Sequence, residues 1–305
     1  MLQPIVVFGS INLDLVARSP RLPVPGETLL GHDLARVPGG KGANQAVAAA
    51  RLGVPTMMVG RVGSDGFGQE LLASLQRSQV QCEGVQVDTS THSGVAIIAV
   101  ADDGENHIIV IPGANGQVNL TDVERLQPLL EGASSLLLQF EIPLPAVQMA
   151  AAAARAAGVR VILDPAPAIA TVPSELYTLV DILTPNAVEA AQLVGFAVDT
   201  PAEIERAAKA LLQRGVKQVV IKLGETGAFC ATASEAFWVP AFSVQAIDTV
   251  AAGDAFNAGM AVALAEGRSL RESLTWGSAA GALTVTKTGA QSSLPDRAAL
   301  EACLV

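Results

Sequence analysis

The sequence predicts an α/β fold: a doubly wound, mostly parallel sheet sandwiched by helices, with a small β-sheet beside it. Short apolar runs alternate with helical segments through most of the 305 residues, which indicates parallel strands covered on both faces. Polar residues and a glycine follow successive strands, and ligands bind at that edge of such sheets. These residues are Glu141, Asp164, Asn186, Glu189 and Gly224. A hairpin that interrupts the alternation predicts the small sheet.

The chain begins with a buried strand at Ile5–Phe8 and then leaves the alternation twice. Asn12 and Asp14 are two residues apart in an extended segment and so face the same way, although an Asx turn is the alternative. Residues 14–37 contain three prolines and little helical period, and we expect a short strand near 27–31. Residues 94–100 and 107–111 flank an Asp-Gly turn and predict the hairpin. The hairpin either joins residues 14–37 in a small sheet or forms an antiparallel edge of the main one.

Paired glycines precede an alanine-rich helix that ends near Leu52. Gly39 and Gly40 allow close approach of the backbone to a ligand, and Lys41 and Asn44 share one face of the helix. A solvated lysine at a helix start is the alternative for Lys41. The segment is no Walker A loop, because glycine and not Ser or Thr follows the lysine.

The remaining elements follow the strand–helix rhythm. Strands are predicted at 55–60, 135–140, 159–163, 181–183 and 218–222. Helices are predicted at 67–78, 143–157, 201–214, 255–265 and 270–286, with loops at 63–68 and 287–293.

Composition excludes several classes of protein. A net charge of −10 and a pI near 4.8 argue against nucleic acid as a partner, which requires a basic face. No apolar run is long enough to span a membrane, and no basic leader precedes the first strand. Cys82, Cys230 and Cys303 form neither a zinc motif nor a disulfide framework, so we expect a cytoplasmic protein.

The segment from Asp248 to Gly259, DTVAAGDAFNAG, carries the strongest chemical signal. Small residues precede a helix start, where backbone N–H groups and the helix dipole attract anions. A carboxylate at that place, Asp254, suits a base that takes a proton from a hydroxyl while the amides hold a phosphoryl group. The alternative is that Asp254 is a simple N-cap.

Six motifs stand in order over nearly the whole chain: GSINLD, GGKGANQA, DPAPA, TPNAVE, DTVAAGDAFNAG and TKTGAQSS. Together they resemble the ribokinase-like carbohydrate kinases of the phosphofructokinase-B type. The resemblance implies an ATP-dependent kinase for a small sugar, ribose giving ribose 5-phosphate, with fructose or another sugar of the family as the alternative. A non-catalytic binding protein would predict a damaged anion site, and a dehydrogenase would need a GxGxxG turn after a strand.

The resemblance also implies the organisation of the chain. A catalytic α/β domain would comprise residues 1–13, 38–93 and 112–305, and a β-sheet lid residues 14–37 and 94–111. The lid would close over the sugar and would form the contact of a homodimer.

Residue roles are carried over from the same resemblance. Asp254 would be the base, in an anion hole with Ala251, Ala252 and Gly253. The sugar would be held by Asn12, Asp14, Gly39, Gly40, Lys41, Asn44, Glu141 and Asp254. The nucleotide would lie against Asn186, Lys222, Gly224, Gly227 and Gly253.

Two cofactors are implied as well. Mg²⁺ would accompany ATP and be reached through water from Glu189. K⁺ or a similar monovalent cation would be held near the anion hole by Asp248, Val250, Thr284, Lys287, Gly289 and Ser293. Two positions depart from the family pattern, Val250 and Lys222, where threonine is common.

Overall fold

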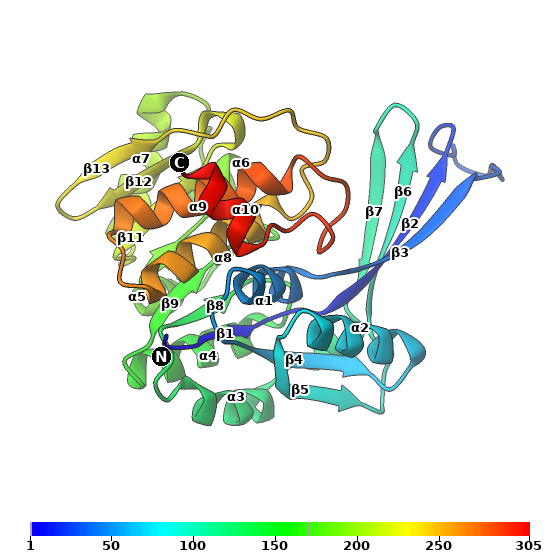
Figure 1. The fold of residues 1–305 in the computed structure, drawn as a ribbon, viewed down its shortest axis with the longest axis horizontal. Coiled ribbons are helices and arrows are strands. Elements are labelled where there is room, and N and C mark those ends of the chain that lie inside the picture. The colour runs from blue at the N-terminus through cyan, green and yellow to red at the C-terminus, as the bar shows by residue number, and fades with distance from the viewer. Residues whose placement is uncertain (1, 170) are drawn as a thin grey trace.

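The main sheet of the computed structural model, which describes residues 2–169 and 171–305, has nine strands in the order β13-β12-β11-β10-β9-β8-β1-β4-β5 (Figure 1). Pairing is parallel from β5 to β11, and β12 and β13 add an antiparallel edge. The strands are β1 (Ile5–Phe8), β4 (Thr56–Gly63), β5 (Gln81–Asp88), β8 (Ser135–Leu138), β9 (Arg160–Leu163), β10 (Ile182–Leu183), β11 (Gln218–Lys222), β12 (Ala228–Thr232) and β13 (Ala236–Val239).

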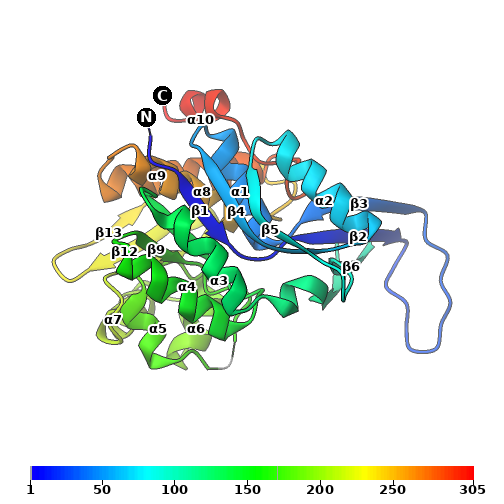
Figure 2. The same cartoon turned by 90° about the horizontal axis from the view of Figure 1, so that it is seen from below.

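Helices cover both faces of this sheet, as the alternation predicted (Figure 2). One face is covered by α1 (Lys41–Arg51), α2 (Gly66–Arg77), α8 (Ala252–Ala265), α9 (Leu270–Thr284) and α10 (Arg297–Cys303). The other is covered by α3 (Leu120–Leu126), α4 (Leu144–Ala156), α5 (Ser174–Leu179), α6 (Ala187–Val194) and α7 (Pro201–Gln213). All four residues of β1 are buried, because a parallel strand between two helical layers has no solvent face.

The strand order reverses beside β1. The chain runs from β1 outward through β4 and β5, then returns to β8 on the other side and continues through β9, β10 and β11. Such a switch point leaves a crevice at the carboxyl ends of the adjacent strands, which is where ligands bind in open α/β sheets. The fold therefore places the candidate site at the ends of β1 and β8.

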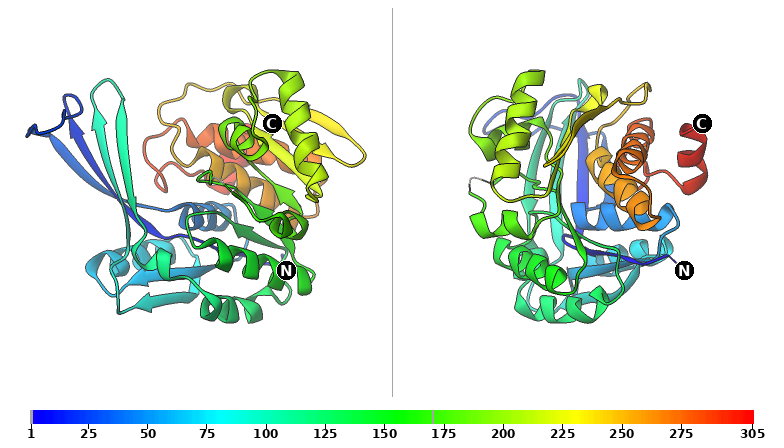
Figure 3. Two further views of the ribbon diagram at one scale, coloured as in Figure 1. Left: turned by 180° about the vertical axis from the view of Figure 1, so that it is seen from behind. Right: turned by 90° about the vertical axis from the view of Figure 1, so that its left-hand side faces the viewer.

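A separate sheet of four strands stands off the main domain, as the view from behind shows (Figure 3, left). It contains β2 (Asn12–Ser19), β3 (Asp33–Gly39), β6 (Gly94–Ala101) and β7 (Asn106–Ile111) in the order β3-β2-β6-β7. The hairpin of β6 and β7 therefore forms the small sheet together with residues 12–39. It is not an antiparallel edge of the main sheet. That this sheet acts as a lid stays a prediction.

Three sequence expectations about elements were wrong. Residues 27–31 form no strand; the strands β2 and β3 lie to either side, and Leu30 is 86% exposed in the loop between them. The loop expected at 63–68 gives way to α2 at Gly66, because the Asp65 side chain caps this helix at Gly68 N. Helix α8 begins at Ala252, before Asp254.

Several shorter elements were not foreseen, among them β5, the β12–β13 edge and α10. The short helical turns η1 (Gly113–Gln117), η2 (Gln127–Leu130) and η3 (Gly224–Thr226) complete the fold. Within the described residues, every helix is too short or too polar to span a bilayer.

Candidate active site

The start of α8 lacks a side-chain cap, as do the starts of α1, α4 and α5, and differs from them in the backbone of its N-cap residue. Its N-cap is Ala251, in the left-handed conformation with φ of 62°, and no side chain caps the helix. Capping by Asp254 is therefore excluded: it is the third helical residue, and its carboxylate faces other elements. The first-turn N–H groups keep no side-chain acceptor, which leaves the helix start available to an anion.

Asp254 is 5% exposed and accepts one hydrogen bond on each carboxylate oxygen. Asn44 Nδ2 donates to Oδ2 at 3.0 Å, and Gln45 Nε2 donates to Oδ1 at 3.1 Å, both from α1. Burial raises the pKa of Asp254 to about 6, against the opposing effect of Lys41, while Asp164 raises it further. A carboxylate with this pKa is ionised at neutral pH and close enough to it to accept a proton from a hydroxyl.

The sugar-side residues predicted from sequence lie together at the junction of β2, β3 and α1. Asn12 pairs with Gly39 across the two strands, and a side chain on Gly39 would come within 2.4 Å of Asp14 Oδ2. Gly40 has φ of 86°, and a Cβ there would lie 2.7 Å from Asn12 N. Gly40 is thus required by the close approach of β2 to the start of α1, whereas a side chain at Gly39 would displace the Asp14 carboxylate.

Two further acids and a lysine belong to this group. Burial raises the pKa of Asp14 to about 7, and the neighbouring carboxylates of Glu141 and Asp254 add to the rise. Glu141 Oε2 accepts from Lys41 N at 3.0 Å and from the Ser10 hydroxyl. Glu141 therefore ties the end of β8 to the start of α1.

The Lys41 ammonium lies among carboxylates. Burial alone would lower the pKa of Lys41, but its acidic neighbours outweigh burial and raise that pKa. These neighbours are Asp254, Asp164, Glu141 and Glu189. A lysine in such surroundings stays charged. Its burial among acids does not fit the alternative interpretation of Lys41 as a solvated lysine at a helix start.

On the opposite side of Asp254, Lys222 Nζ donates to Asp164 Oδ1 at 2.8 Å. The same ammonium lies 3.3 Å from where a Cβ on Gly253 would be, so it reaches the start of α8. Asn186 forms an isolated bridge with Lys222 and a capping box with Glu189. Burial and Asp164 raise the pKa of Glu189, against Lys222.

Gly224 and Gly227 form the turn that reverses the chain between β11 and β12. Their φ values are 58° and 98°, and a Cβ on Gly227 would lie 2.0 Å from Val239 O. The turn needs glycine for these reasons alone, so contact with a nucleotide stays a prediction for both residues.

The segments predicted to hold a monovalent cation meet at Asp248. Its carboxylate accepts from Val250 N at 3.0 Å and from Gly289 N at 2.8 Å, and Asp248 N donates to Val285 O. The buried Thr284 and Ser293 hydroxyls donate to the carbonyls of Ala280 and Ala290, and Lys287 is exposed. The Asp248 carboxylate already accepts two backbone N–H groups, so the binding of a monovalent cation by it and by oxygens of the neighbouring segments stays a prediction. No group of three or more His, Cys, Asp or Glu within the described chain could hold a metal by itself.

The sequence did not assign roles to several residues that the structure brings to the site. Gln45 and Gln139 form a buried hydrogen bond of 2.7 Å beside Asp254, and Ser10 bonds Glu141. Asp164 was noted only as a polar residue after a strand. The one available signal was the place of Gln139 and Asp164 directly after β8 and β9.

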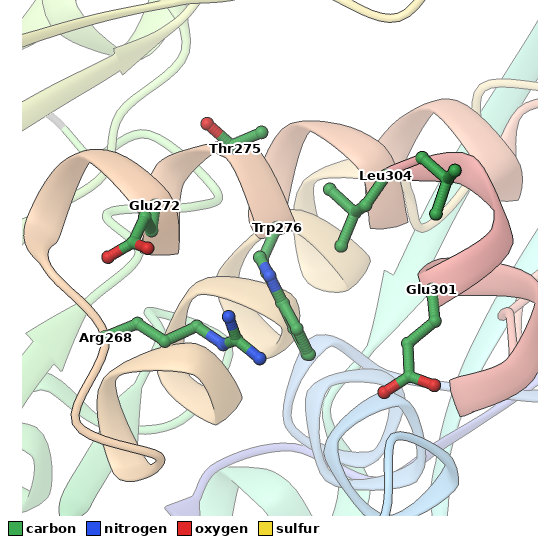
Figure 4. Close-up of a pocket in the computed structure, with 7 residues that line it drawn as sticks. Arg268, Glu272, Thr275, Trp276, Glu301 and Leu304 are labelled. Carbon is green, nitrogen blue, oxygen red and sulfur yellow. The ribbon is translucent and has the colours of Figure 1, made fainter.

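Two surface cavities contain none of these residues. One, of about 420 Å³, lies at α9 and α10 against Trp276, with Arg268 stacked 4.3 Å from its ring (Figure 4). The other, of about 320 Å³, lies around Arg61, which pairs with Asp88 and Asp122. The first cavity lies at α9 and α10 and the second at the carboxyl ends of β4 and β5, so both are separate from the acids and lysines described above.

Comparison with known proteins places this arrangement in a family. The profile of the pfkB family of carbohydrate kinases matches residues 2–297. The chain belongs to the pfkB family of carbohydrate kinases. The ribokinase of Haemophilus influenzae is 40% identical over 297 residues, which covers 97% of each chain. The ribokinase of Schizosaccharomyces pombe is 41% identical over 302 residues, with 95% of this chain and 94% of the relative covered.

Solved structures agree with the family. An Arabidopsis thaliana ribokinase complexed with ribose and ATP superimposes with a TM-score of 0.92 at 37% identity, covering 100% of this chain and 99% of that one. A Thermotoga maritima ribokinase gives a TM-score of 0.90 at 37% identity, covering 100% and 99%. The pfkB fold predicted from the motifs, a doubly wound sheet with a small second sheet, is confirmed.

Proposed function

We propose that the protein is an ATP-dependent ribokinase that transfers the γ-phosphoryl group of ATP to a hydroxyl of ribose, giving ribose 5-phosphate. The observation that carries this proposal is the ionisable, buried carboxylate of Asp254 beside the uncapped start of α8. The ribokinases of 40% and 41% identity and the ribose–ATP complex of a relative support ribose as the acceptor.

In this mechanism Asp254 orients the acceptor hydroxyl and takes its proton as the phosphoryl group arrives. The N–H of Gly253 would face the transferring group and stabilise its charge, as N–H groups at helix starts do for anions, and the N–H of Ala252 would join it on release from Thr249 O, to which it donates at 3.3 Å. Positioning and electrostatics supply most of the rate in phosphoryl transfer. Asn12, Asp14 and Lys41, grouped at the other side of Asp254, would bind the remaining hydroxyls of the sugar.

The nucleotide side fits ATP bound with Mg²⁺. Two neighbouring carboxylates, Asp164 and Glu189, provide the oxygen ligands that Mg²⁺ prefers, directly or through its waters. When bound, Mg²⁺ neutralises charge on the phosphates. Lys222, held by Asp164 next to Gly253, is placed to contact a phosphate. A monovalent cation at Asp248 would order the loop before α8 and so the anion hole.

The small sheet provides a candidate dimer contact. All six residues of β7 are exposed, and Ile108, Ile109 and Val110 are each at least 50% exposed. Because successive side chains of a strand point to opposite faces, β7 presents exposed apolar side chains on both faces of the small sheet, a surface suited to contact with another chain. We propose that a second copy of the chain covers it.

Three free cysteines agree with the reducing cytoplasm as the place of action.

A coupled ADP-release assay over ribose, deoxyribose, fructose and adenosine tests the proposal. Ribose should give the highest kcat/KM. Fructose as the best acceptor would favour the alternative, fructokinase, and release of ADP that is independent of any sugar would exclude a sugar kinase.

A further inference from the structure

Gln45 lies between the carboxylate of Asp254 in α8 and that of Asp164 after β9. Its Nε2 donates to Asp254 Oδ1 at 3.1 Å and to Asp164 Oδ2 at 3.3 Å, and the residue is 1% exposed. Its Oε1 accepts from Gln139 Nε2 at 2.7 Å. The amide of Gln45 is thus engaged on both sides.

The orientation of this amide follows from charge. A flipped Gln45 would turn its oxygen toward both carboxylates, and in a buried site that repulsion is severe. Gln139 must therefore donate, which leaves its own Oε1 buried without a hydrogen-bond partner among the described residues. A Cβ on Gly9 would lie 2.0 Å from that oxygen, so glycine makes room for it. The fold accepts an unsatisfied polar atom, which is unfavourable, to hold Gln45 in this orientation.

The contacts continue to the nucleotide side. Asp164 uses its second oxygen to hold Lys222 at 2.8 Å, and Lys222 lies beside Gly253 at the start of α8. A continuous chain of contacts therefore joins the base Asp254, through Gln45 and Asp164, to the lysine nearest the anion hole.

We propose that Gln45 is a positioning residue of the phosphoryl transfer, an inference that rests on the proposed function. Its amide holds the Asp254 carboxylate at the acceptor hydroxyl and keeps the Asp164–Lys222 pair in register with it. Because Gln45 acts through these groups, its loss should change the chemical step much more than the binding of ATP or ribose.

A pH dependence follows from the charged groups around Asp254. The charges of Lys41 on α1 and Asp164 after β9 act on the pKa of Asp254, Asp14 on β2 lies close enough to interact with it, and Glu141 after β8 interacts with both Asp14 and Lys41. Burial raises the pKa of Asp254, whereas the amide of Gln45 lowers it. Without that amide the pKa rises, so more of the base is protonated at a given pH and the acidic limb of the kcat profile moves to higher pH.

The test compares two substitutions with different shapes and charges. Gln45→Leu should lower kcat about 10- to 100-fold, the range expected for losing a hydrogen bond to a charged group, with the KM values for ATP and ribose within about twofold. Gln45→Glu keeps the shape but places a third carboxylate beside Asp254 and Asp164, so it should be the more damaging at neutral pH. If only shape mattered, Glu would be tolerated better than Leu, and that order would overturn the proposal.

The matched control is Gln218→Leu, the same substitution at the first residue of β11, at the other end of that strand from Lys222. It should leave kcat and the pH profile unchanged. Should Gln45→Leu lack a cooperative thermal transition, Gln139→Leu decides, since it removes only the donor to Gln45. That variant should show a smaller fall in kcat and a smaller shift of the acidic limb, both in the same direction as in Gln45→Leu, and wild-type behaviour overturns the proposal. An inactive wild-type protein would instead refute the proposed function, whereas an active wild type matched by both variants refutes only the role of Gln45.

Discussion

The substitution Asp254→Asn removes the proton-accepting carboxylate but keeps the shape of the side chain. Asparagine has the shape of aspartate, so α8 and its packing are retained, but it cannot accept the proton of the acceptor hydroxyl. It also presents an NH₂ group to one of the two amides that now donate to Asp254, so one of the hydrogen bonds from Asn44 or Gln45 is lost.

The expected fall in kcat is about 10²–10⁴, the usual contribution of a general base, which corresponds to about 2.7–5.4 kcal/mol of transition-state stabilisation. The melting temperature, by contrast, should not fall. Burial raises the pKa of Asp254 from its ordinary value of 3.8 to about 6, so above pH 6 the folded protein holds a charge that burial disfavours. Asparagine removes this charge, and the melting temperature at pH 7 should be equal to or above that of the wild type.

Single-turnover kinetics with ATP and ribose, together with thermal denaturation and ATP titration, measures both effects. ATP affinity should be nearly unchanged. Wild-type turnover in Asp254→Asn would refute the assignment of the base. A loss of activity accompanied by an equally clear loss of stability would show that Asp254 acts through the fold and not through the reaction.

Three further predictions address the sugar site, the cation and the small sheet. The pKa of Asp14 is raised to about 7, so KM for ribose should rise as pH falls through 7 and an acceptor is lost, whereas Asp14→Asn should give a high KM that does not change with pH. Replacing K⁺ by Tris should lower kcat several-fold in the wild type, and Asp248→Ala should remove this sensitivity; indifference of the wild type would exclude the cation site. Ile109→Lys should convert a dimer to a monomer in sedimentation velocity, because Ile109 is 62% exposed on β7. The control Leu120→Lys, exposed on α3, should leave the assembly as it is, and an unchanged dimer in Ile109→Lys would place the contact elsewhere.

Apolar runs in the sequence predicted the central strands of the main sheet but missed its edge strand β5. A strand such as β1 is apolar throughout because both its faces are covered, and the sequence shows this directly. The edge strand β5 reads QCEGVQVD, and its half-exposed, polar pattern resembles a loop. The strand expected at 27–31 was a misreading of apolar residues in an exposed turn, while the actual strands on both sides are paired with distant partners.

The candidate site was predictable where residues act in motifs and unpredictable where they act through contacts. The segment around Asp254 predicted a base and a helix start; the helix begins at Ala252, with Ala251 at its N-cap position and no capping side chain. The contact of Gln45 with Asp254 joins residues 209 positions apart, and that of Lys222 with Asp164 joins residues 58 apart. No spacing in the sequence reveals such pairs. The first exists because α1 packs against α8, and the second because β9 and β11 end at the same edge of the sheet.

The most direct test of a carboxylate that deprotonates a sugar hydroxyl as phosphorus arrives is ³¹P NMR of the reaction of ATP with ribose. The wild type should convert the γ-phosphorus signal into a phosphate monoester coupled to the protons of ribose carbon 5, with an equal amount of ADP, and Asp254→Asn should form it at least about a hundred times more slowly. Release of inorganic phosphate in place of the monoester, or equal rates in the two proteins, would contradict the account.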